Sequence, residues 1–118
     1  MSKGVLAEKS LVFAIKVVQF CRLLQEQKKE FVLSKQFMRS GTAIGALIRE
    51  ADYAESKLDF IHKLHIALKE ANETEYWLII LKESKLMSIE EFNVMENENK
   101  ELLKLLISSI KTLKAKYK

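Results

Sequence analysis

Proline is absent from this chain of 118 residues, and glycine occurs only three times. Sheet proteins of this size need a tight turn every ten residues or so, and such turns draw heavily on glycine and proline. The shortage therefore excludes collagen-like and loop-rich folds and favours long helices. Apolar residues make up 48% of the chain, which also excludes a disordered polymer. A single all-α domain fits this length and composition.

Cysteine and long apolar runs are scarce as well. Cys21 is the single cysteine, so one chain cannot form an internal disulfide or a cysteine-based metal site. We therefore expect a reduced, cytoplasmic location. The apolar runs are far shorter than the roughly 20 residues that a bilayer-spanning helix needs, and Glu8, Lys9 and Lys16 interrupt the pattern of a signal peptide. The sequence thus predicts neither a membrane span nor a leader.

Apolar residues recur at helical spacing in four blocks, which predict helices over about 5–29, 34–54, 56–86 and 88–115. Ser34 and Ser56 are expected N-caps, and Ser88 with Glu91 forms an expected capping box. The third and fourth blocks repeat their apolar residues in alternating steps of three and four, which is typical of a heptad seam. Because the connections are short, successive helices should be antiparallel. The predicted fold is an antiparallel, up-down-up-down four-helix bundle over residues 1–118.

The first block is apolar around most of its circumference. Phe13 and Val17 belong to one seam, while Leu11 and Ile15 cover much of the remaining surface. A helix of this kind must be buried on more than one side. We therefore expect it to mediate contact between copies of the chain.

The second block holds two glycines four residues apart, Gly41 and Gly45. Glycine inside a soluble helix costs on the order of 1 kcal/mol relative to alanine. Close backbone approach by a neighbouring helix would offset this cost, and we expect the small-residue strip to take part in self-association. The alternative is a kink or a frayed first turn at one of the glycines.

Two stretches of the chain carry a recognisable pattern. The first is the small-residue run QFMRSGTAIGA over 36–46, followed by Glu50, and the second is IALKEANETEYWL over 66–78. Together they resemble the bacterial four-helix-bundle family first noticed as proteins encoded within intervening sequences of 23S ribosomal RNA genes. That family also includes the accessory variability proteins of diversity-generating retroelements. The residues that carry the resemblance are Arg39, Gly41, Gly45, Glu50, Lys69, Glu70, Glu73 and Trp77.

The resemblance has implications for assembly and partners. It implies a non-enzymatic, homo-oligomeric bundle in the form of a pentameric ring or barrel. The partners that it implies are RNA or DNA, or a nucleic-acid enzyme such as a reverse transcriptase.

The predicted register of the second and third helices brings charges together. If these helices pack antiparallel around the turn between them, residues whose numbers sum to about 110 lie level with each other. Arg39 would then face the region of Glu70, Glu73 and Glu75, and we predict a partly buried ion pair because a guanidinium fork suits a carboxylate. The alternative is separate, solvated side chains. Trp77 is expected at a contact between subunits.

A metal or catalytic site would need further ligands beside these carboxylates. A di-iron bundle needs Glu-x-x-His on two helices and further glutamates on the others, whereas both histidines, His62 and His65, lie on one predicted helix. The spacing of Gly41 and Gly45 lacks the lysine and the strand of a phosphate-binding loop. The sequence therefore predicts no metal, no cofactor, no small-molecule substrate and no enzymatic activity.

The net charge of +4 resides on the first and last blocks. Five lysines of the fourth block share one face, and two lysines of the first block lie seven residues apart. A stripe of this kind could bind the phosphate backbone of nucleic acid, or it could simply be a solvated face that keeps the protein soluble. The candidate nucleic-acid-binding residues are Lys9, Lys16, Lys100, Lys104, Lys111, Lys114 and Lys118.

Two functional hypotheses follow from these patterns. The first is an accessory protein that binds nucleic acid, or an enzyme acting on it, through basic outer surfaces. The second is a self-assembling structural or protein-interaction module without nucleic-acid binding. Both predict self-association, and they differ over salt-dependent binding to RNA or DNA.

Overall fold

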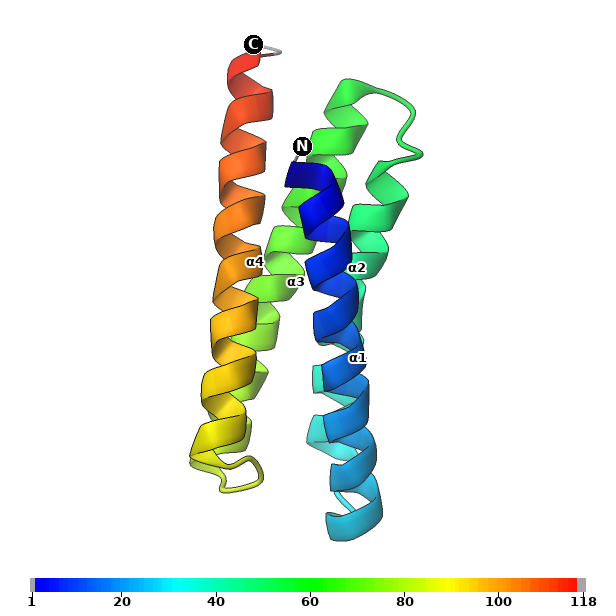
Figure 1. The fold of residues 1–118 in the computed structure, drawn as a ribbon. Helices are drawn as coiled ribbons and strands as arrows, with labels where there is room; N and C mark the ends of the chain where they lie inside the picture. Colours follow the sequence, from blue (N-terminus) through cyan, green and yellow to red (C-terminus); the bar gives the residue numbers. More distant parts are fainter. Residues whose placement is uncertain (1, 117–118) are drawn as a thin grey trace.

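The computed structural model describes residues 2–116, and these form four helices and no strand (Figure 1). Their order is α1 (Ser2–Lys28), α2 (Val32–Ala51), α3 (Lys57–Glu83) and α4 (Ile89–Lys116). The helices run alternately in opposite directions in a bundle of 48 × 22 × 19 Å, so the predicted all-α class is confirmed. Each helix packs against two others, and the contact between α1 and α4 is the least extensive. Within the described range, no helix is long and apolar enough to cross a bilayer.

The buried residues of α3 and α4 recur at heptad spacing and form these helices' part of the core. The apolar repeats of the third and fourth blocks begin at Phe60 and Phe92, and both side chains are half-buried near the starts of their helices. Ile61 and Ile110 are buried instead and complete the two faces. On α3 the buried residues are Ile61, Leu64, Ala67, Ala71, Thr74, Leu78 and Leu81. On α4 they are Met95, Glu96, Asn99, Leu102, Leu106 and Ile110.

Two of the three predicted helix starts are confirmed. The Ser56 hydroxyl accepts a hydrogen bond of 3.0 Å from the Asp59 amide at the start of α3. The Ser88 hydroxyl accepts from the Glu91 amide at 3.0 Å, and the Glu91 carboxylate accepts from the Ser88 amide at 2.9 Å. These are the reciprocal bonds of a capping box.

The predicted N-cap at Ser34 is wrong, because α2 begins two residues earlier. The Glu30 carboxylate accepts hydrogen bonds from the amides of Val32, Leu33 and Ser34 at 3.1, 3.0 and 2.8 Å. Ser34 is buried inside the first turn, where its hydroxyl donates to the Glu30 carbonyl at 2.7 Å and accepts from Gln25 at 3.1 Å. A longer carboxylate therefore satisfies the amides that a serine cap would have served.

The two glycines of α2 face α1 of the same chain. A Cβ added at Gly41 would lie 2.9 Å from Cγ2 of Val17, and one added at Gly45 would lie 3.2 Å from Oγ of Ser10. The glycines therefore permit close approach of the two helices, as expected, and α2 is a continuous helix through both. The expected part of this strip in contact between subunits stays a prediction.

Candidate nucleic-acid interface

The carboxyl-terminal half of α4 presents a basic face. Lys104 and Lys111 line a shallow groove with Ile107, Ser108 and Thr112. Lys104, Lys111 and Lys114 are exposed, and none of them makes an ion pair with another residue of the described range. We call these three residues the α4 lysine face. Because no carboxylate of residues 2–116 pairs with them, their positive charges are available to an external anion.

Two further lysines of the predicted stripe add less to this face. Lys100 is exposed, and its Nζ lies 3.8 Å from the Glu96 carboxylate one turn earlier. Lys118 lies outside the described residues.

The lysines of α1 have a different environment from the one expected. Lys9 Nζ lies 3.1 Å from the Glu101 carboxylate, and Lys16 forms an ion pair with Glu98. Both pairs join α1 to α4, the helix contact with the least extensive packing. The expectation that Lys9 and Lys16 continue an uncompensated stripe is therefore not met, because acidic residues of α4 balance their charges.

Four residues of the recognisable pattern, Arg39, Glu70, Glu73 and Trp77, form a polar cluster on the outside of α2 and α3. Arg39 Nη1 lies 3.2 Å from a carboxylate oxygen of Glu70, and Arg39 Nη2 lies 2.5 Å from Oε2 of Glu73. Trp77 Nε1 donates to the same Glu73 oxygen at 2.9 Å. These donors, Trp77 first and then Arg39, hold the pKa of Glu73 below its usual range.

The predicted ion pair is thus confirmed, but it is more exposed than expected, because the Arg39 side chain keeps 49% of its surface accessible. Trp77 is half-buried and packs edge-on against the exposed Tyr76. Its expected contact with another subunit stays a prediction. Glu50 joins the same two helices at a second level, 3.4 Å from Lys63 Nζ, and Lys69 is exposed on α3. The pairs of Arg39 and Glu50 both join α2 to α3.

A carboxyl pair between α3 and α4 was not predicted from the sequence. Glu96 is buried, and burial together with the neighbouring Glu75 raises its pKa to about 7. One turn later, Asn99 is fully buried, and its amide donates to the Ala71 carbonyl at 2.9 Å. The burial of Asn99 could have been found from the sequence, since Asn99 occupies a heptad position among apolar residues of the fourth block.

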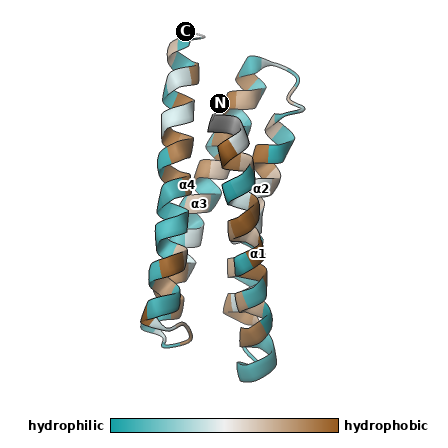
Figure 2. Cartoon of the chain, viewed as in Figure 1, coloured by the Kyte–Doolittle hydropathy of each residue, from teal (hydrophilic) through white to brown (hydrophobic). Residues whose placement is uncertain are grey.

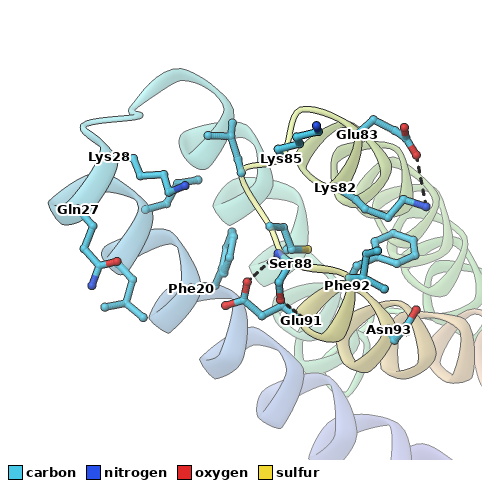
Figure 3. Close-up of a pocket in the computed structure, with 15 residues that line it drawn as sticks. Phe20, Gln27, Lys28, Lys82, Glu83, Lys85, Ser88, Glu91, Phe92 and Asn93 are labelled. Carbon is cyan, nitrogen blue, oxygen red and sulfur yellow. Dashed lines mark hydrogen bonds and ion pairs between the residues drawn. The ribbon is translucent and has the colours of Figure 1, made fainter.

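A hollow lies where α1 meets the connection between α3 and α4 (Figure 3). Its volume is about 780 Å³, and its walls include Phe20, Leu24, Met87 and Phe92. Figure 3 shows the Glu91 side chain near its centre. The Glu91 carboxylate already accepts a hydrogen bond from the Ser88 amide in the capping box. In the range that the structure describes, no group of three His, Cys, Asp or Glu side chains could hold a metal ion.

Comparison with known proteins assigns the chain to a family. A family model described as 23S rRNA-intervening sequence protein matches residues 4–108. A solved structure described as a protein with unknown function from the S23 ribosomal protein family of Bacteroides thetaiotaomicron is 52% identical, with a TM-score of 0.92. The alignment covers 94% of this chain and 99% of that one. Among curated proteins no match is found. The chain therefore belongs to the 23S rRNA-intervening sequence protein family.

Proposed function

We propose that this protein is a non-enzymatic accessory protein that binds the phosphate backbone of RNA or DNA through the α4 lysine face. The observation that carries the proposal is the exposure of Lys104, Lys111 and Lys114 on one helix, without an ion pair among the described residues. The family name refers to 23S rRNA, and the structural neighbour is assigned to a ribosomal protein family. Both names favour RNA as the first ligand to test.

The expected mode of binding is electrostatic. Lysine contacts to phosphate release condensed counterions, so the affinity falls steeply as salt is added. Lysine side chains of this kind position a backbone and do not read base edges. We therefore expect similar affinity for RNAs of different sequence.

Self-association would multiply this basic face. We propose that copies of the chain associate through the outer surface of α1, where large apolar side chains are exposed. An assembly would present one α4 lysine face per subunit, and affinity for a polyanion grows with the number of neutralised charges. Five subunits, and a reverse transcriptase as partner, stay predictions from the family resemblance.

The test compares two variants that change the net charge equally. Replacing Lys104, Lys111 and Lys114 by glutamate should abolish binding to a fluorescently labelled single-stranded RNA, measured by anisotropy in dilute buffer. The matched control replaces the exposed residues Lys29, Lys35 and Lys69 by glutamate and should retain most of the affinity. An equal loss of RNA affinity in both variants would show that binding depends on the net charge and not on the α4 lysine face, which would contradict the proposal. No binding by the wild-type protein would contradict the proposal and leave the self-assembling module, which the apolar surface of α1 favours.

A further inference from the structure

The outer surface of α1 combines exposure with apolar character along most of the helix. This helix packs against α2 on one flank and α4 on the other, and it lies at the front of the bundle in Figure 2, where apolar segments run along it. Single exposed apolar residues are ordinary, but five on one helix of a small protein are not. Their exposed fractions lie between 44% and 55%, and they are Val5, Leu11, Val12, Ile15 and Leu23.

Two opposite charges bracket this surface symmetrically. Glu8 lies seven residues before Ile15, and Arg22 lies seven residues after it. Seven residues are close to two helical turns, so all three side chains project from the same face, about 10 Å apart along the axis. Both charged side chains are exposed, and neither pairs with another residue of the described range. The pattern is negative, apolar, positive.

This pattern is complementary to itself in one orientation. When two copies of α1 are laid antiparallel and centred on Ile15, residues whose numbers sum to about 30 face each other. Glu8 of each copy then meets Arg22 of the other, and the two Ile15 side chains meet at the centre. In the parallel orientation, each charge would meet its own like charge. Electrostatics therefore selects the antiparallel arrangement.

We propose that the outer face of α1 binds the same face of a second copy in antiparallel orientation, with Ile15 at the two-fold axis and two Glu8–Arg22 pairs at the ends. The inference rests on the self-association proposed above and specifies its geometry. A two-fold contact is closed, because each copy uses the same patch once. It forms a dimer, or it joins two rings if five-membered rings close through other surfaces.

Charge reversal tests this geometry, because the two-fold symmetry places Glu8 opposite Arg22 at both ends of the contact. Glu8→Arg alone places Arg opposite Arg in both pairs, and Arg22→Glu alone places Glu opposite Glu. Each variant should dissociate at least about tenfold more readily than the wild type, with half the particle mass in light scattering. An equimolar mixture of the two variants should recover the full mass, because a mixed pair restores opposite charges at both ends.

The controls separate this inference from the proposed function. Circular dichroism should show unchanged helix content, since both residues are exposed. Reversal of Lys35 or Glu55, which lie outside α1, should leave the particle mass unchanged. An unchanged particle mass in both the Glu8→Arg and the Arg22→Glu variant would overturn the antiparallel pairing but not self-association. A mixture of the two variants that does not regain the wild-type mass would have the same consequence. A monomeric wild-type protein at high concentration would overturn both, and RNA binding by the α4 lysine face would still be judged by its own variants.

Discussion

Alanine in place of Gly41 would add one methyl group at the tightest point between α1 and α2. The new Cβ would lie 2.9 Å from Cγ2 and 3.0 Å from Cγ1 of Val17. Rotation about χ1 of the valine cannot relieve both contacts, and valine in a helix strongly prefers one rotamer. Overpacking of this kind costs about 1 to 3 kcal/mol, whereas the gain in helix propensity is about 1 kcal/mol. We expect a net loss of about 1 kcal/mol.

Thermal and urea unfolding measure this loss directly. For a chain of this length, about 1 kcal/mol lowers the melting temperature by roughly 4 °C. In a Val17→Ala background the obstructing methyl groups are gone, and Gly41→Ala should then stabilise the fold by up to about 1 kcal/mol. Gly4→Ala is the control, since nothing lies within 4 Å of its added Cβ. Equal or greater stability of Gly41→Ala beside an intact Val17 would refute the close approach of the helices.

Three further predictions concern Glu96, Glu30 and Arg39. Because Glu96 binds its proton more tightly in the folded state, with a pKa of about 7, its contribution to stability should fall as the pH rises from about 4.5 to about 7. Relative to wild type, Glu96→Gln should therefore gain about 1 to 3 kcal/mol in the free energy of unfolding between acidic and mildly alkaline solution. Glu30→Ala should cost about 1 to 2 kcal/mol in urea unfolding, because three amides of α2 lose their acceptor. Arg39→Met should cost no more than about 1 kcal/mol, since the arginine is half exposed, and added salt should shrink the difference.

Each of these outcomes has a clear opposite. A stability difference between Glu96→Gln and wild type that does not change with pH would show that the buried carboxyl titrates normally. Unchanged stability of Glu30→Ala would mean that water serves the amides of α2 equally well. A loss of several kcal/mol in Arg39→Met would show that the exposed ion pair contributes far more than surface pairs do.

Features set by neighbouring residues could be predicted from the sequence. The capping box at Ser88 and Glu91 depends on residues three apart, and both bonds form. The pairing of Arg39 with Glu73 was also predicted, because an antiparallel register fixes which residues lie level. Ser34 failed as a cap because the competing acceptor, Glu30, lies outside the predicted helix.

Contacts between helices that are far apart in the sequence could not be predicted in this way. Spacing placed Lys9 and Lys16 on one face of α1, but it could not show that Glu101 and Glu98 of α4 would reach them. The same limit applies to Glu96, whose burial depends on how α4 packs against α3. Helical periodicity gives the direction of a side chain on its own helix, whereas its partners depend on how the helices are rotated against each other.

The salt dependence of RNA binding is the most direct test of the proposed α4 lysine face. The slope of the logarithm of the binding constant against the logarithm of the sodium chloride concentration counts neutralised phosphates. For a single-stranded RNA, we predict that replacing Lys104, Lys111 and Lys114 by glutamine, which weakens binding without reversing the charge, reduces this slope by about 2 per bound subunit. Equal slopes for the wild type and the triple variant would contradict the account.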